Sequence, residues 1–229
     1  MFAGRPGDAD ALSHVRWLGG GSGGGKTTVA RELAARHGLR LYQLEPLSRF
    51  AARSNRSPSP LLDAFMAMDM DERWVNRSPE IMLETFHAFH GEGFELVLAD
   101  LRGLPTGRPV LVEGFPLLPR LVRPLVTRRR DAVWLLPTPG FRRRAFDRRG
   151  STWTIPAQTS DPRRALANLL ERDRLFTEEL RAEAGMLGLE TIEVDGAETA
   201  AEVARRVEQS LGLTNGPTGG GPANRRRLH

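Results

Sequence analysis

The sequence contains no cysteine, which excludes disulfide bonds, thiolate catalysis and zinc sites built on cysteine. It also lacks any apolar run near the roughly 18 residues of a membrane span, and residues 1–11 lack the apolar core of a signal peptide. At 229 residues, 40% of them hydrophobic and 27% charged, the chain is long enough for one domain with a sizeable core. We therefore expect a cytoplasmic protein without a membrane partner.

Lysine is almost absent as well, since Lys26 is the only lysine among 33 lysine and arginine residues. It follows the run Gly20-Gly21-Ser22-Gly23-Gly24-Gly25 and precedes Thr27. Together these residues fit G-x-x-x-x-G-K-[ST], the phosphate-binding or Walker A loop. The presence of lysine only at position 26 indicates that arginine cannot replace it there. A compact ammonium reaches the β/γ-phosphates where a broad planar guanidinium does not fit. The motif predicts binding of a nucleoside triphosphate.

The positive charge is concentrated in short arginine runs. The net charge is +5 and the pI is about 10.9, with runs at 128–130, 142–144, 148–149 and 225–227. Such clusters occur in nucleic-acid-binding proteins, on solvated arginine-rich surfaces and around polyphosphates. Because 28 acidic residues are interspersed, we do not expect nucleic acid as the primary partner.

Apolar runs and helical periodicity alternate along most of the chain. We expect strands at 14–18, 40–44, 110–113, 131–136 and 190–194, and helices at 26–37, about 161–186 and about 198–211. Short apolar strands separated by helices predict a five-stranded parallel sheet with helices on both faces. The glycine run follows the first strand and opens a helix, as the phosphate loop requires. The pattern therefore predicts the three-layer α/β fold of P-loop NTPases.

The composition divides the chain into three parts: a flexible leader at 1–12, a P-loop domain at 13–213 and a disordered basic tail at 214–229. Within the domain we expect a helical insert at about 60–104, broken near 76–79 and 91–93, and an arginine-rich lid at about 139–150. The acceptor pocket is expected between the second strand and the insert, whose densest polar cluster is Asp69–Trp74, with His87 and His90 further along.

Two classes of nucleotide-binding protein can be excluded. Guanine-specific GTPases of the usual type read the base with Asn-Lys-x-Asp, and this chain has no second lysine. Protein kinases carry their lysine on a strand rather than in a glycine loop. The remaining pattern resembles the small-molecule and nucleotide kinases of the P-loop class, on four segments: Gly20–Thr28, Val110–Phe115, Phe141–Arg149 and Thr191–Gly196.

The strand that ends in Glu-Gly is similar to that of the uridine-kinase and nicotinamide-riboside-kinase branch. More closely, the stretch from about 14 to 212 resembles an adenylate-kinase-like family of actinobacterial proteins. Of the four segments, only the loop is highly specific. The resemblance implies an ATP-dependent phosphotransferase, as a monomer or homodimer, and does not name its acceptor.

The loop residues have separate expected roles. Lys26 is expected to hold the β/γ-phosphates, and Thr27 to place its hydroxyl on Mg²⁺. The glycines let the backbone approach the phosphates without an intervening Cβ. Ser22 and Thr28 add hydroxyls nearby. The expected nucleotide site thus comprises Gly20, Gly21, Ser22, Gly23, Gly24, Gly25, Lys26, Thr27 and Thr28.

Two carboxylates end strands at the carboxyl edge of the expected sheet, where ligands bind in open α/β folds. Glu113 would reach Mg²⁺ through water, or the hydroxyl of the substrate; its structural alternative is a cap on the turn at Gly114. In many small-molecule kinases the place of Glu45 carries an aspartate that accepts the proton of the attacking hydroxyl. Glutamate is one methylene longer, so Glu45 is equally a base or a surface residue.

Arginines are the expected partners of the transferred phosphoryl group, because negative charge spreads over its oxygens. Arg142 and Arg149 are seven residues apart on one helical face, so both can point at the phosphates. Arg172 on a later helix is a second clamp, or half of an ion pair within the helix. For each of these arginines a solvated or structural role is the alternative.

Three hypotheses follow. The first is a Mg²⁺- and ATP-dependent kinase of a small hydroxylated molecule, nucleoside or nucleotide, in which Lys26, Glu45, Glu113, Arg142 and Arg149 act in catalysis, Arg172 binds the nucleotide, and Thr27 and Glu113 hold the metal. The second is a regulatory or interaction module that binds ATP without useful phosphotransfer. The third, a nucleic-acid-linked protein, is motivated by the arginine runs.

Overall fold

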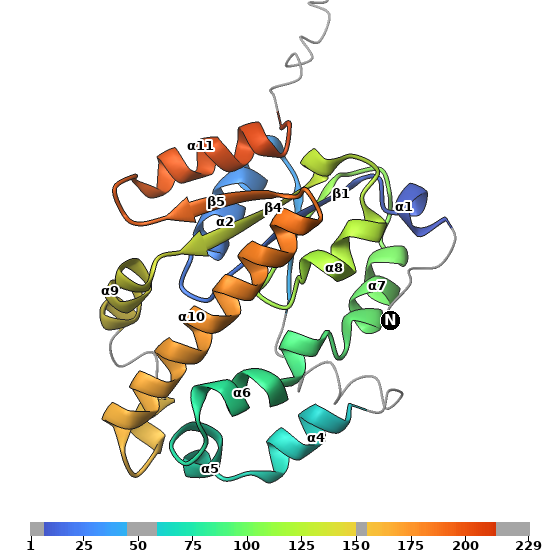
Figure 1. Ribbon diagram of the computed structural model, residues 1–229. Helices are drawn as coiled ribbons and strands as arrows, with labels where there is room; N and C mark the ends of the chain where they lie inside the picture. Colours follow the sequence, from blue (N-terminus) through green and yellow to red (C-terminus); the bar gives the residue numbers. More distant parts are fainter. Residues whose placement is uncertain (1–6, 45–58, 150–154, 214–229) are drawn as a thin grey trace, which may run out of the picture.

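Five parallel strands form one sheet in the computed structural model, which describes residues 7–44, 59–149 and 155–213 (Figure 1). The sheet has the order β2-β3-β1-β4-β5, and all four pairings are parallel. The strands are β1 (Val15–Gly20), β2 (Arg40–Gln43), β3 (Val110–Glu113), β4 (Ala132–Pro137) and β5 (Glu190–Val194).

Helices cover both faces of the sheet. On one face, α2 (Lys26–His37) and α11 (Ala200–Ser210) pack against the strands. On the other face lie α7 (Phe94–Arg102), α8 (Pro119–Val122) and α10 (Pro162–Met186). This is a three-layer α/β architecture, as the alternation of apolar runs and helical patterns predicts.

Local sequence signals fix the ends of the main helices. Helix α2 begins directly after the glycine run and ends at Gly38, whose φ of 63° is the left-handed conformation favoured at helix ends. Helix α10 starts with Pro162, and the Asp161 side chain accepts a hydrogen bond from the backbone N–H of Arg164 at 3.0 Å. Buried positions then recur every three or four residues along α10, so one continuous face stays in contact with its neighbours.

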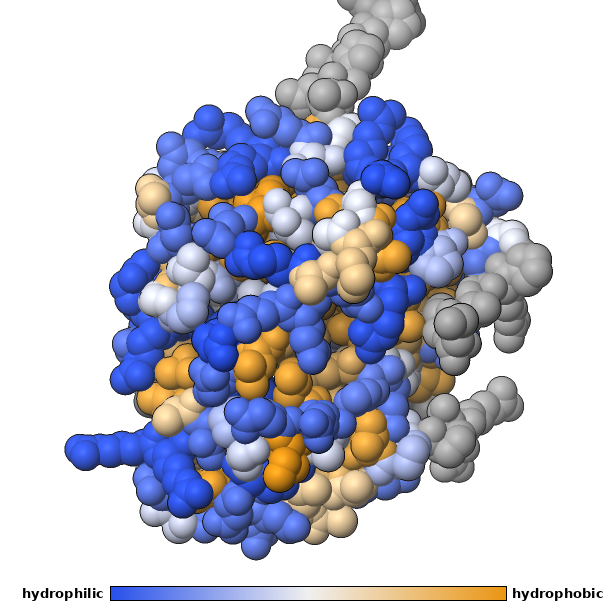
Figure 2. Space-filling view, viewed as in Figure 1, coloured by the Kyte–Doolittle hydropathy of each residue, from blue (hydrophilic) through white to orange (hydrophobic). Residues whose placement is uncertain are grey.

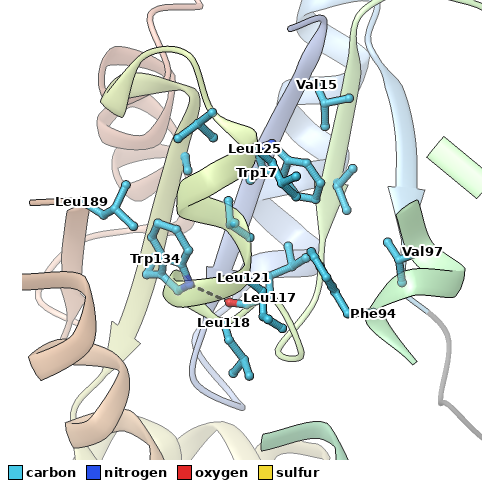
Figure 3. Packing of buried hydrophobic residues seen from close by; sticks show 14 of the residues in the cluster. Val15, Trp17, Phe94, Val97, Leu117, Leu118, Leu121, Leu125, Trp134 and Leu189 are labelled. Atoms are coloured by element: carbon cyan, nitrogen blue, oxygen red, sulfur yellow. Dashed lines mark hydrogen bonds between the residues drawn. The ribbon is translucent and has the colours of Figure 1, made fainter. Parts of the chain in front are cut away.

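The largest of the three core clusters among the described residues lies between the sheet and the helices α7, α8 and α10 (Figure 3). Trp17 on β1 and Trp134 on β4 are both fully buried there. The Trp134 indole Nε1 donates a hydrogen bond of 2.7 Å to the backbone oxygen of Leu117. This bond satisfies the polar atom that burial of the ring would otherwise leave without a partner.

A group of short helices lies below the sheet in Figure 1 and packs against the N-terminal half of α10. The Glu92 carboxylate accepts hydrogen bonds from the backbone N–H groups of Leu61 and Leu62 at 3.0 Å each. It therefore caps the N-terminus of α4 (Pro60–Ala67), the first of these short helices. On the face shown in Figure 2 the hydrophobic side chains are most evident over this lower half. The other elements of the group are α5 (Met70–Trp74), α6 (Pro79–Thr85) and the 3₁₀ helix η1 (His87–His90).

The structure departs from the sequence expectations mainly in short elements. Residues 8–11 of the expected leader form helix α1 (Asp8–Ala11), and Asp8 pairs with Arg102 at 2.8 Å. Leu12 is buried, so packing begins before residue 13. The helix expected at about 161–186 is continuous. The segment expected as the lid forms α9 (Pro139–Arg149). Further short elements are η2 (Arg123–Leu125), η3 (Arg129–Asp131) and η5 (Pro156–Gln158).

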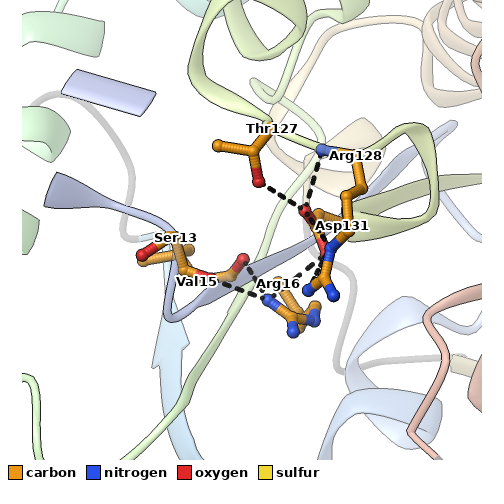
Figure 4. Close-up of polar contacts among 6 residues, drawn as sticks. All are labelled: Ser13, Val15, Arg16, Thr127, Arg128 and Asp131. Carbon is orange, nitrogen blue, oxygen red and sulfur yellow. Dashed lines mark hydrogen bonds and ion pairs between the residues drawn. The ribbon is translucent and has the colours of Figure 1, made fainter. Parts of the chain in front are cut away.

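The amino edge of the sheet holds a buried carboxylate (Figure 4). Asp131, directly before β4, accepts hydrogen bonds from the backbone and guanidinium of Arg128 and from the Thr127 hydroxyl. It also pairs with Arg16 of β1 at 3.4 Å. These contacts tie the start of β4 to the start of β1. In the described ranges no helix is both long and apolar enough to cross a membrane.

Candidate active site

The strand order creates a crevice at the carboxyl edge of the sheet. The chain leaves β1 toward β2 on one side, and leaves the neighbouring β4 toward β5 on the other. In open α/β sheets, ligands bind outside the carboxyl ends of strands that diverge in this way. The glycine run 20–25 connects β1 to α2 at this point.

Two glycines of the loop have backbone geometries that exclude other residues. Gly20 has a φ of 127°, and a Cβ there would lie 2.0 Å from the backbone oxygen of Leu135 on β4. Gly25 has a φ of 80° and is the residue from which α2 starts. The sequence motif explains these glycines by the close approach of the backbone to the phosphates. At Gly20, the close contact with β4 is already enough to require glycine.

The loop leads into the N-terminus of α2, where the first backbone N–H groups have no partner within the helix. Lys26 is the first residue of this helix and is 8% exposed. Its Nζ donates a hydrogen bond of 2.8 Å to the backbone oxygen of Gly21, so the ammonium lies across the loop. An ammonium beside a helix N-terminus makes this an electropositive site for an anion.

Glu113 lies beside the loop, at the carboxyl end of β3, and is 5% exposed. Its Oε1 accepts hydrogen bonds of 2.8 Å from the Thr27 hydroxyl and of 2.8 Å from Gln43 Nε2. The structure thus brings Glu113 and Thr27 together, the two residues that the sequence predicts to hold the metal. Gln43 was not predicted from the sequence, although a polar residue at the end of β2 was a usable signal.

Arg142 of α9 binds the loop from the other side. It is 1% exposed, and its Nε donates to the backbone oxygen of Ser22 at 3.1 Å. Its Nη2 donates to the Thr177 hydroxyl, which in turn donates to the backbone oxygen of Asp173 at 2.7 Å. Burial lowers the pKa of Arg142, and the nearby Asp173 carboxylate opposes that shift. Arg142 thus braces the loop through α10.

Two further arginines of α9, Arg143 and Arg144, are exposed. Arg143 pairs with Asp147 on the same helix, and Arg144 donates to the backbone oxygen of Asp195 at 2.7 Å. Their contacts are therefore on the surface and away from the loop.

A cavity of about 370 Å³ opens from the loop toward the short helices. Ser22 forms one end of it, and most of the wall is hydrophobic. The phenylalanine and tryptophan residues of the wall come from several separate segments: Phe65, Trp74, Phe86, Phe89, Phe94, Phe115 and Phe176. Its size is typical of a pocket for one small organic molecule.

Arg172 and Asp173 of α10 form the charged part of this wall. Arg172 donates from Nε at 3.0 Å and from Nη2 at 2.6 Å to Asp173 Oδ1. The guanidinium carbon lies 4.8 Å from the centre of the Phe86 ring and 5.3 Å from that of Trp74. Of the two sequence alternatives for Arg172, the structure has the ion pair, and it places the side chain against the aromatic cavity.

The polar cluster at residues 69–73 is used within the insert itself. Asp69 caps α5 by accepting the Glu72 N–H at 2.7 Å, Asp71 accepts the Ser160 N–H at 2.7 Å, and Arg73 donates to the backbone oxygen of Met66 at 2.9 Å. These contacts are structural. Only Trp74 of this segment lines the cavity.

The two histidines of η1 have different surroundings: His87 lines the cavity and is buried, whereas His90 is exposed. Burial, together with the positive charge of Arg172, lowers the pKa of His87 to about 4. In the part of the chain that the structure describes, no three histidine, aspartate or glutamate side chains gather as a metal site would need. Glu45 and the side chain of Arg149 lie outside the described residues.

Comparisons with known proteins add little to this geometry. No protein-family model matches the chain, and no curated protein matches it. Among solved structures, YorR from Bacillus subtilis, crystallised with phosphorylated GDP, is similar over 87% of this chain and 96% of its own, at 14% identity and a TM-score of 0.42. A likeness at this level says nothing about what the present chain binds.

Proposed function

We propose that this protein is a P-loop kinase that transfers the γ-phosphate of ATP to a hydroxyl or phosphate of a small molecule. The observation that carries the proposal is the loop at the carboxyl edge of β1, with Lys26 on one side and the Thr27–Glu113 contact on the other. A glycine loop, a helix N-terminus and a lysine are the elements that bind triphosphates in this class.

The loop residues would bind the nucleotide. Backbone N–H groups at the start of α2 would donate to the phosphates, and Lys26 Nζ would neutralise the β- and γ-phosphates. Arg142 holds the Ser22 end of the loop through hydrogen bonds to Ser22 and Thr177. A braced loop needs no reorganisation when charge develops on the transferred group, which is how preorganised sites lower a barrier.

The residues around Glu113 fit Mg²⁺. The Thr27 hydroxyl donates a hydrogen bond to Glu113, so the lone pairs of the Thr27 oxygen remain available for a cation. Both hydrogen bonds that Glu113 accepts from described residues go to Oε1, which leaves Oε2 to bind a water of the ion. Few protein ligands, all of them oxygen, are typical of Mg²⁺ beside phosphates. When bound, the ion supplies charge neutralisation at the phosphate oxygens.

The aromatic cavity would hold the acceptor, because it begins at Ser22 of the loop and extends into the helical insert. The acceptor hydroxyl would then meet the phosphate in line, with Glu45 or Glu113 accepting its proton. We assign residues 139–150 to a lid, from which Arg142 and Arg149 would act on the phosphates. Exclusion of water by such a lid would favour transfer over hydrolysis.

The test is acceptor-dependent release of ADP from Mg-ATP, measured with a coupled assay across nucleosides, nucleoside monophosphates and aromatic alcohols. Lys26→Ala is the loss-of-function variant. Arg31→Ala is its matched control, since it removes an exposed cation from the same helix. We expect one acceptor class to raise the rate in the unmodified protein and in Arg31→Ala, and not in Lys26→Ala.

Two results would contradict the proposal. Equal acceptor-dependent rates in Lys26→Ala and the unmodified protein would remove the loop from catalysis. Saturable ATP binding without ADP release for any acceptor would instead favour the regulatory module.

A further inference from the structure

The cavity beyond Ser22 combines an aromatic wall with buried polar atoms. Phe89 and Phe176 stack with ring centres 3.8 Å apart and an interplanar angle of 17°, and Phe86 lies 4.9 Å from Phe89. Phe65 meets Phe86 edge-on, with 5.3 Å between ring centres. Rings in this arrangement offer both faces and edges to a flat ligand, which is how aromatic pockets bind ring compounds.

One guanidinium nitrogen in this wall has no acceptor. Arg172 is 7% exposed, and its Nε and Nη2 bind Asp173, but Nη1 is buried without a hydrogen-bond partner among the residues that the structure describes. Nδ1 of His87 is in the same situation. A buried donor without an acceptor is destabilising, so a ligand oxygen that binds it is strongly favoured.

Two guanidinium groups and one carboxylate interact around this nitrogen. Arg142 and Arg172, both buried, share the carboxylate of Asp173. His87 is neutral near pH 7, because its pKa is lowered to about 4. The Glu92 carboxylate also lines the cavity, where it accepts the N–H groups at the N-terminus of α4. Arg172 Nη1, which has no acceptor among the described residues, therefore favours an anionic oxygen beside it.

We propose that the cavity binds a flat aromatic acceptor that carries an anionic oxygen, with its ring among Phe86, Phe89 and Phe176 and its oxygen on Arg172 Nη1. The inference rests on the proposed function, since this compound would be the phosphoryl acceptor. It assigns Arg172 to the acceptor and not to the nucleotide. Free sugars and polycationic alcohols are disfavoured, because the aromatic wall cannot satisfy their many hydroxyl or ammonium groups.

The test compares two ligands of nearly the same shape. Hydroxynaphthoate and hydroxynaphthamide have the same ring and hydroxyl, and differ in a carboxylate against a neutral amide. Their dissociation constants are measured by calorimetry on the full chain without ATP. We expect the unmodified protein to bind the carboxylate at least about tenfold more tightly, as a charge-assisted bond to guanidinium predicts.

A double variant then localises the preference. Arg172→Met with Asp173→Asn removes the donors without leaving a buried carboxylate unpaired, and we expect the tenfold preference to fall below about twofold. Arg163→Met removes an exposed arginine from the same helix and should keep the preference. The inference is overturned if the unmodified protein binds neither ligand or both equally, or if the double variant keeps the preference.

The outcome separates this inference from the proposed function. ATP affinity is measured on the same samples with unmodified protein and Lys26→Ala. Lys26-dependent ATP binding without a preference for the carboxylate overturns the acceptor class alone. Absence of Lys26-dependent ATP binding overturns the kinase, whichever ligand the cavity prefers.

Discussion

Asp131 at the amino edge of the sheet and Glu113 at its carboxyl edge are both buried carboxylates next to parallel strands, but their surroundings differ. Asp131 uses both oxygens, accepting from Arg128 and Thr127 and pairing with Arg16. Glu113 accepts both of its hydrogen bonds from described residues at a single oxygen. Both oxygens of Asp131 are used within the protein, whereas Glu113 Oε2 retains capacity for a ligand.

The same contrast holds for the cations. Arg16 and Arg128 both form ion pairs with the Asp131 carboxylate, and this network joins the starts of β1 and β4. At the carboxyl edge, Lys26 and Arg142 donate to backbone oxygens of the glycine loop. Lys26 places its positive charge beside the N-terminus of α2, where an anion would bind. Substitutions at the amino edge should alter stability, and those at the carboxyl edge should alter binding and turnover.

The largest effect is expected for Lys26→Arg, a substitution at the carboxyl edge. The charge is kept, but the planar guanidinium does not fit the place of a compact ammonium beside Gly21. We expect acceptor-dependent ADP release to fall by roughly 100- to 1,000-fold, comparable with the loss of one preorganised donor. The free energy of unfolding, measured with a denaturant, should change by less than about 1 kcal/mol. Turnover within a few-fold of the unmodified protein would show that charge alone suffices.

The opposite edge supplies the next largest effect. Asp131→Asn removes the charge that Arg16 and Arg128 share, and we expect a loss of about 3 kcal/mol in the free energy of unfolding. Affinity for Mg-ATP in the folded protein should not change. Asp147→Asn is the control, because its pair with Arg143 is exposed and should contribute below about 1 kcal/mol. A stability loss no larger than that of the control would contradict a structural role for Asp131.

Glu113→Gln tests the carboxyl edge without changing side-chain volume. The amide oxygen can still accept from Thr27, but the negative charge is lost. We expect the Mg²⁺ concentration needed for half-maximal turnover to rise by about 10- to 100-fold. Glu193→Gln, at an exposed carboxylate paired with Arg181, should leave it unchanged. A normal Mg²⁺ requirement in Glu113→Gln would leave Glu113 as a cap of the turn at Gly114.

The smallest effect concerns pH. The pKa of His87 lies at about 4 in the folded protein, so the unfolded chain takes up a proton between pH 6.5 and 4 that the folded one does not. Stability should therefore fall as the pH drops through this range, by at most about 1 kcal/mol per pH unit. In His87→Gln this part of the slope should vanish, while the exposed His90→Gln keeps it. Parallel slopes in all three proteins would contradict the buried, neutral state of His87.

The sheet and the loop could be predicted from the sequence because their signals are local. Apolar runs give the strands, as at Val110–Glu113 and Ala132–Pro137, and the glycine run fixes the start of α2. Parallel strands end at one edge, so Glu113 and Thr27 could be expected to meet. The short helix Pro119–Val122 could not be predicted, since four residues show no periodicity.

The aromatic cavity was not predictable for a different reason. Phe65, the pair Phe86 and Phe89, and Phe176 come from three separate segments, and their spacing would be the same in a filled core. The burial of Arg142 and the pairing of Arg172 depend on where α9 and α10 pack. In the sequence alone, by contrast, runs of arginine are typical of a solvated surface. Tertiary packing thus decides which charged residues belong to the site.

The most direct test of the central assignment is calorimetric titration of the unmodified protein and Lys26→Met with ATP in the presence of Mg²⁺. If the loop binds the triphosphate, the unmodified protein will bind one ATP per chain, and Lys26→Met will bind at least about 100-fold more weakly, or by about 2.7 kcal/mol. The same affinity in both proteins, or no saturable binding to the unmodified protein, would contradict a nucleotide site at the carboxyl edge of β1.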